Sequence, residues 1–195
     1  PELGVDPINI AAHIYISLQE IIAREISATK PAVVTIGKFV GGEAPNIIPG
    51  EVVMEGTIRA LDKEVGEFIF DRMKDIVEST AKMFRGEAKL IELSSVPPLT
   101  NDTELAKEVT SYVKDLVGEK AVCLFEGGGM GSEDFASYSY EVPSVYLMLG
   151  AGTKQENPLY GEPMHNEKVV FNEDILVTGA AMHTYCSIMW LKNNK

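Results

Sequence analysis

The fold is decided by residues 32–59, which read AVVTIGKFVGGEAPNIIPGEVVMEGTIR. Residues 32–40 and 51–59 are rich in Val, Ile and Thr, the residue types that favour β-strands. Between them, residues 41–50 hold two prolines and three glycines, which mark a loop. This stretch therefore predicts two strands joined by a long, stiffened loop.

A helix is predicted on each side of this strand pair. The first helix begins at Asp6-Pro7, because Asp6 can cap free backbone N–H groups and Pro7 loses no hydrogen bond there. It continues to about Ile26, and the second helix runs from about Lys63 to Arg85. Both segments carry apolar residues at helical spacing, so we expect each helix to pack one face against the strands.

Residues 89–93 predict one more strand, so the order is helix, strand, strand, helix, strand. This order is one strand short of the split βαβ (ferredoxin-like) arrangement, whose first strand would lie before Pro1. Two consecutive prolines after Val96 mark a domain boundary, because proline continues neither a helix nor a central strand. We therefore expect an α+β domain over residues 1–96 and a second domain over residues 97–195.

The second domain is predicted to mix helices with short apolar strands. Asn101 followed by Glu104 has the spacing of a capping box, which opens a helix that ends at Gly118. The other expected elements, two apolar strands and a last helix, cover residues 121–125, 144–149 and 174–191.

The composition excludes several classes of protein. With 45% hydrophobic and 24% charged residues, the chain of 195 residues is globular, not disordered or fibrous. Asp and Glu outnumber Lys and Arg by 29 to 17, and the net charge of −12 repels phosphate backbones and anionic lipids. No apolar run approaches the roughly 20 residues of a membrane span, and no secretory signal is visible. We expect neither nucleic acid nor membrane as a partner, and a cytoplasmic location.

Polar residues in four segments can do chemistry, and each also has a simpler explanation. His165 lies in an aperiodic loop, either as a solvent-exposed residue or as a functional one. Gly131 and Ser132 either join a strand to a helix or present backbone N–H groups to a carboxylate or carbonyl. Arg59 either caps a surface strand or pairs with a carboxylate in bidentate fashion. Asn46, between two prolines, either completes a turn or offers its amide to a ligand.

Five segments together resemble one enzyme family. They are PELGVDPI (1–8), GGEAPNIIP (41–49), EGTIR (55–59), MGSEDF (130–135) and PMHN (163–166). In this order they are similar to successive motifs of the metal-dependent aminoacylase/carboxypeptidase amidohydrolases. Within that family they most resemble the branch of hippurate hydrolase, N-acetyldiaminopimelate deacetylase and the auxin-conjugate hydrolases.

The resemblance implies a two-metal catalytic domain that is interrupted by a lid, which is also the dimerisation domain. It assigns residues 1–96 to a split-βαβ lid that lacks its first strand. Residues 97–195 would form the C-terminal part of an α/β zinc-peptidase-like catalytic domain. The lid would pair with the lid of a second copy, so the resemblance implies a homodimer.

The resemblance also assigns roles to the candidate residues. His165 corresponds to the family's last metal ligand. The Asn46 amide would reach the scissile carbonyl, the Arg59 guanidinium would hold the substrate carboxylate, and Gly131 and Ser132 would line the pocket.

The other metal ligands and the glutamate general base would belong to an N-terminal half that these residues do not include. A zinc site needs three or four protein ligands, so one histidine cannot assemble a centre of two zinc (or manganese, cobalt or nickel) ions. We predict part of an amidohydrolase that cleaves N-acyl amino acids or related small peptides, with the isolated chain inactive. The alternative is a non-catalytic dimerisation or ligand-binding module that keeps the lid fold.

Overall fold

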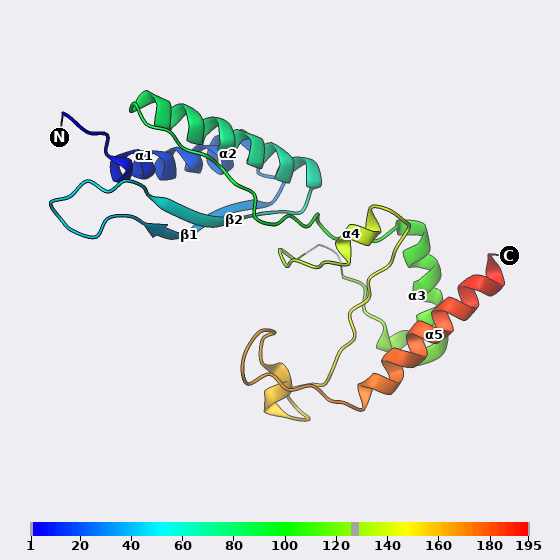
Figure 1. Cartoon of the computed structure of the whole chain (residues 1–195). Helices are drawn as coiled ribbons and strands as arrows, with labels where there is room; N and C mark the ends of the chain where they lie inside the picture. The colour runs from blue at the N-terminus through cyan, green and yellow to red at the C-terminus, as the bar shows by residue number, and fades with distance from the viewer. Residues whose placement is uncertain (1, 126–128, 195) are drawn as a thin grey trace. The chain divides into compact units, whose positions relative to one another are not determined.

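The computed structural model describes residues 2–125 and 129–194 (Figure 1). These residues form two compact units, one of residues 2–98 with 129–134 and one of residues 99–125 with 135–194. The elements of the first unit are α1 (Pro7–Glu20), a π-helical turn (Ile21–Glu25), β1 (Ala32–Val40), β2 (Val53–Ala60) and α2 (Lys63–Met83). The protein is thus a mixed α/β structure with a small antiparallel sheet.

Helix α1 begins where the sequence predicts. The Asp6 carboxylate accepts hydrogen bonds from the backbone N–H groups of Ile8 and Asn9, at 2.9 and 3.2 Å. The α-helical pattern ends at Glu20 and continues as one π-helical turn to Glu25, so the expected extent of the helix is confirmed although its last turn is wider.

Strands β1 and β2 pair antiparallel over their whole length, with a bulge between Ile36 and Lys38. A Cβ atom on Gly56 would lie only 2.3 Å from the carbonyl oxygen of Thr35, so glycine permits the close approach of the strands at this position. The loop of residues 41–52 joins the strands. The predicted strand pair and its long connection are confirmed.

Helices α1 and α2 cover one face of this sheet (Figure 1). Helix α2 begins after Asp62, whose carboxylate accepts from the N–H groups of Glu64 and Val65. The buried residues of the core lie at helical spacing on the two helices and their junction: Ile10, Ile14, Leu18, Ile21, Val65, Ile69, Met73, Val77 and Ala81. The predicted packing of one face of each helix is confirmed.

The strand predicted over residues 89–93 does not form. Ala88 and Leu90 pack against the core while Lys89 and Ile91 are exposed, so the alternation that suggested a strand is present. A strand also needs a neighbour to complete its backbone hydrogen bonds, and the described residues provide no such neighbour.

The second unit contains helices and long irregular segments. Its elements are α3 (Thr103–Val117), a 3₁₀ turn (Glu119–Ala121), α4 (Ala136–Ser139), a second 3₁₀ turn (Pro158–Gly161) and α5 (Ile175–Asn193). The two long predicted helices are confirmed, but the capping residue of α3 is Asp102, whose carboxylate accepts from the Leu105 N–H group at 2.8 Å. Asn101 instead bonds to the backbone of Tyr146, so its assignment as the cap was wrong.

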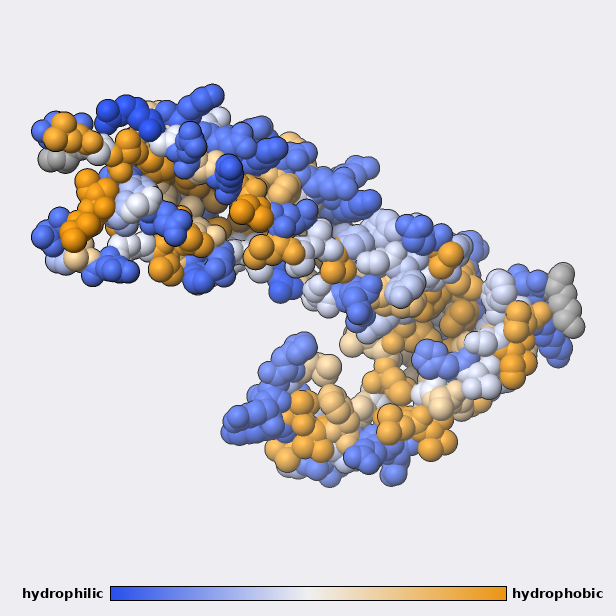
Figure 2. Space-filling model, in the orientation of Figure 1, coloured by the Kyte–Doolittle hydropathy of each residue, from blue (hydrophilic) through white to orange (hydrophobic). Residues whose placement is uncertain are grey.

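The apolar segments 121–125 and 144–149 form no strand ladder with the described residues. Few described residues of the second unit are buried, and none of them lies on α5. Hydrophobic side chains therefore gather at the surface of this unit (Figure 2). Within the described ranges, no helix is long and apolar enough to cross a bilayer.

Candidate functional site

Arg59 lies on the open face of the β1–β2 sheet. Successive strand residues point to opposite faces, and Ile58 points to the helices, so Arg59 points away from them. Its guanidinium donates a hydrogen bond to the backbone carbonyl of Met130. No carboxylate of the described residues pairs with Arg59. A guanidinium has five N–H donors, so the contact with Met130 leaves donors for a ligand.

The segment that Arg59 contacts contains Gly131 and Ser132, which are both exposed. The structure thus brings Arg59 next to the glycine-rich segment that the sequence singled out. Gly131 and Ser132 do not directly precede a helix, because α4 begins only at Ala136 and spans four residues. Residues 126–128, the first part of the glycine-rich stretch, lie outside the described residues.

Asn46 lies at the other end of the same strand pair. It is exposed in a turn that is closed by a hydrogen bond from the Ile47 N–H group to the Ala44 carbonyl. Its side-chain amide forms no hydrogen bond with the described residues. Val53, where β2 begins, and Arg59 are separated by six residue steps, which is roughly 20 Å in a strand. The hairpin therefore does not bring Asn46 and Arg59 together.

His165 belongs to the second unit, in the loop before α5. It is exposed and has a left-handed backbone conformation, with φ at 64°. The next residue, Asn166, organises the turn, since its side chain accepts from the Lys168 N–H group at 2.9 Å and donates to Glu162 at 3.3 Å. Left-handed backbone is costly for a non-glycine residue and occurs often at functional sites.

The metal-binding potential of the described residues is limited to isolated side chains. Nowhere in residues 2–125 and 129–194 do three His, Cys, Asp or Glu residues lie close enough together to hold a metal ion. His165 can thus supply one ligand of a metal site, and the described part of the chain does not supply the rest.

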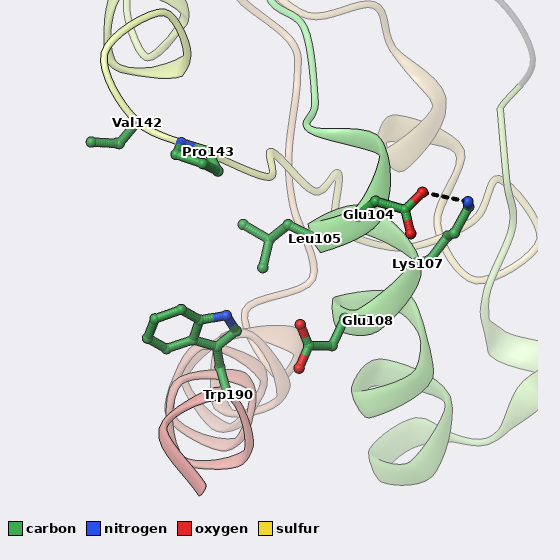
Figure 3. Close-up of a pocket in the computed structure, with 7 residues that line it drawn as sticks. All are labelled: Glu104, Leu105, Lys107, Glu108, Val142, Pro143 and Trp190. Carbon is green, nitrogen blue, oxygen red and sulfur yellow. Dashed lines mark hydrogen bonds and ion pairs between the residues drawn. The ribbon is translucent and has the colours of Figure 1, made fainter. Parts of the chain in front are cut away.

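A pocket in the second unit has a different chemistry. It has a volume of about 790 Å³ and contains none of the predicted site residues (Figure 3). Leu105, Trp190 and the Val142-Pro143 turn give it apolar walls, beside the carboxylate of Glu108.

Glu108 is held by other side chains of the second unit. Its carboxylate accepts from the Tyr112 hydroxyl and, at 2.9 Å, from the Asn194 amide. Burial, followed by the hydrogen bond with Glu108, raises the pKa of Tyr112. Sequence reasoning missed this cluster, although Glu108 and Tyr112 are four residues apart on one helix face and so predict contact. Because the Asn193 amide of α5 also donates to the Tyr112 hydroxyl at 2.9 Å, the cluster joins α3 to α5.

Comparisons with known proteins agree with this arrangement. Residues 1–84 match the peptidase dimerisation domain of the M20 type. The chain is 30% identical to hippurate hydrolase of Campylobacter jejuni over 98% of its own length and 48% of the relative. The chain spans about half the length of the curated relatives it matches, for example 48% of this one.

Two solved structures share the fold. A presumed aminohydrolase from methicillin-resistant Staphylococcus aureus has a TM-score of 0.78 and 29% identity, covering 98% of this chain and 48% of that chain. A dinuclear metal binding peptidase of Bacillus subtilis, from the M20 family, has a TM-score of 0.75 and 24% identity. The match covers 96% of this chain and 47% of that chain. Residues 1–84 thus resemble the peptidase dimerisation domain of the M20 type, and the chain as a whole is similar in sequence and fold to about half of several hydrolases and peptidases.

Proposed function

We propose that this chain is part of a metal-dependent amidohydrolase that hydrolyses the amide bond of N-acyl amino acids or related small peptides. Residues 1–96 form its lid, a split βαβ domain whose first strand precedes residue 1, and residues 97–195 form the C-terminal part of its catalytic domain. The similarity to hippurate hydrolase supports the substrate class, because hippurate is an N-acyl amino acid.

The observation that carries the proposal is the environment of Arg59. An N-acyl amino acid offers one carboxylate, and Arg59 is an exposed cation on an open sheet face without a carboxylate partner among the described residues. A planar guanidinium binds a carboxylate through two parallel hydrogen bonds. The contact with the Met130 carbonyl keeps this guanidinium beside Gly131 and Ser132, whose backbone then lines the same site.

His165 provides one ligand of the metal centre. Its imidazole is exposed, and the turn at Asn166 fixes the loop on one side of it. Two divalent ions, zinc or alternatively manganese, cobalt or nickel, supply an activated water and a polarised carbonyl when they are bound. The remaining ligands and the general base come from a half of the protein outside these residues, as the described residues contain no group of three potential ligands.

The proposal is tested with the full-length chain that contains these residues. Loaded with zinc, it is expected to release the amino acid from N-acetyl and N-benzoyl amino acids, as measured by amine release. If a soluble, metal-loaded protein binds these compounds without cleaving them, the non-catalytic ligand-binding module is correct instead. If it neither binds nor cleaves them, both the substrate class and the role of Arg59 are wrong.

A further inference from the structure

The loop that carries His165, residues 151–172, closes on itself. The backbone N–H group of Asn172 donates to the carbonyl of Ala151 at 2.9 Å, so the two ends of the loop meet just before α5 (Figure 1). Within residues 151–172, which the structure describes throughout, the only regular element is the 3₁₀ turn Pro158–Gly161. Long loops whose ends meet and whose own side chains fill them are frequently functional.

The inside of this loop is filled by its own side chains. A Cβ atom on Gly152 would overlap the ring of Tyr160, whose Cγ atom would lie 2.8 Å away. Gly152 also has φ at 117°, a conformation that favours glycine, so both the space and the backbone require glycine there. A Cβ atom on Gly161 would likewise overlap the side chain of Lys154. The loop is therefore tightly packed between its first residues and its 3₁₀ turn.

Hydrogen bonds extend this packing from Tyr160 toward His165. Glu162, which follows the 3₁₀ turn, accepts from the side-chain amide of Asn166 at 3.3 Å. The Asn166 carbonyl accepts in turn from the Val169 N–H group at 3.1 Å. His165 lies within this series of contacts and has a left-handed backbone, with φ at 64°. Such a conformation is costly for a non-glycine residue and persists only where the surrounding structure enforces it.

We propose that the contact between Gly152 and Tyr160 positions the His165 imidazole for metal binding before a metal ion arrives. This inference rests on the proposed function, which makes His165 a metal ligand. All the contacts described above join residues of the same loop, so the loop needs no other segment to make them. A ligand on an ordered loop loses little conformational entropy when it binds a metal, whereas a loose loop must first be ordered. Gly152 and Tyr160 are thus positioning residues.

Amide hydrogen exchange of the full-length protein tests whether the loop closes without metal. In the metal-free protein, the Asn172 N–H group should exchange about tenfold more slowly than an unprotected amide, or more slowly still. Addition of zinc should then change its exchange rate by less than about threefold. If this amide is unprotected without metal and becomes protected only when zinc is added, the metal orders the loop and the inference is overturned.

Substitutions in the full-length protein test the role of the contact. Gly152→Ala and Tyr160→Ala should each weaken zinc binding about tenfold or more, as measured by competition with a chelator, because groups that support a metal ligand contribute that much to affinity. Tyr160→Phe should bind zinc like the parent protein, since it keeps the ring that contacts Gly152.

The matched control is Gly118→Ala, which lies outside the loop. Gly118 has φ at 88°, and a Cβ atom there would meet no atom within 4 Å. This substitution should therefore lower the melting temperature through backbone strain while the zinc affinity stays unchanged. Equal loss of zinc affinity in Gly118→Ala would overturn the inference, because general destabilisation then explains the effect. Parent-like zinc affinity in both Gly152→Ala and Tyr160→Ala would also overturn it.

Hydrolysis of N-acetyl amino acids, measured on the same full-length samples, separates this inference from the proposed function. Activity in a protein whose Asn172 N–H group is unprotected without metal refutes only the inference. A loop that is protected without metal, in a protein that binds zinc but does not cleave these compounds, refutes only the proposed hydrolysis.

Discussion

Arg59 joins β2 to the glycine-rich segment through one hydrogen bond, and the proposed function assigns its other donors to the carboxylate of the substrate. In the full-length enzyme, Arg59→Ala should lower kcat/KM for N-acyl amino acids by about one to two orders of magnitude, because charge-assisted hydrogen bonds contribute roughly 1.5–3 kcal/mol each. Arg59→Lys should also lose activity, since lysine keeps the charge but not the planar fork.

The control for Arg59 is Arg24→Ala, which removes an exposed arginine whose hydrogen bond is to the neighbouring Ala23 carbonyl. Its kcat/KM should match that of the parent enzyme. Substrates whose carboxylate is masked as an amide provide the second test, and on them the Arg59 variants should lose much less. Equal losses on free and masked substrates would show that Arg59 only supports the strand.

His165 is a residue whose backbone and side chain can be tested separately. In the full-length enzyme, His165→Asn should reduce bound metal and activity strongly while the melting temperature of the metal-free protein stays unchanged, because Asn tolerates the left-handed backbone at φ 64°. His165→Ala should lose the same metal and also destabilise the loop. Metal analysis and thermal melts measure the two effects, and full metal content in His165→Asn would remove His165 from the ligand set.

Local features of single residues can be predicted from the sequence, whereas contacts between distant residues cannot. Asp6 and Pro7 define a helix start by local geometry, and the structure contains it. The contact of Arg59 with Met130 joins residues 71 positions apart, and no pattern in the sequence encodes it. The roles of Asn46, Gly131, Ser132 and His165 came from resemblance alone and remain predictions.

At the scale of elements, Arg72 of α2 holds the π-helical turn after α1. Its guanidinium donates to both carboxylate oxygens of Glu25, at 2.6 and 2.9 Å. This hydrogen bonding lowers the pKa of Glu25 below its ordinary 4.5. A carboxyl whose pKa is lowered by folding stabilises the folded state at pH values above its pKa in the unfolded chain. This contribution is lost as the pH falls toward its pKa in the folded state. Below about pH 4.5, the free energy of unfolding of the parent chain should therefore decrease with falling pH more steeply than that of Glu25→Gln.

Urea unfolding of both proteins between pH 3 and 7 measures this difference. The matched control is Glu67→Gln, because the Glu67 carboxylate lies 3.8 Å from Lys63 on an exposed helix surface, where ion pairs contribute little. If Glu25→Gln and the parent chain lose stability in parallel, the pair with Arg72 does not contribute to the acid response.

Elements differ in how far the sequence determines them. The long helices were predicted correctly because their apolar spacing and caps are local. Segments 89–93, 121–125 and 144–149 have the composition of strands but no ladder among the described residues, because a strand requires a distant partner and composition does not supply one.

On the scale of the whole molecule, the 195-residue chain should neither retain divalent metal in stoichiometric amount nor hydrolyse N-acyl amino acids. Affinity is limited by ligand number, and the described residues contain no group of three potential ligands. Dialysis followed by metal analysis tests this, with zinc-loaded full-length protein as the positive control. Tight binding that survives His165→Ala would mean that another site exists.

The chain should also self-associate through its first unit, which matches a dimerisation domain over residues 1–84. Both strands of its two-stranded sheet are edge strands, and Val53 of β2 is 44% exposed. Val53→Lys places a charge at this edge, where burial in a dimer would leave it unpaired, so it should weaken association about tenfold or more. Leu147→Lys is the control, because it places the same charge at a similarly exposed apolar residue of the second unit, where Leu147 is 43% exposed. Sedimentation equilibrium at high micromolar concentration distinguishes the two surfaces. Weakening by Val53→Lys alone locates the dimer contact on the first unit, and weakening by Leu147→Lys alone locates it on the second unit. A monomer throughout would contradict association through either unit.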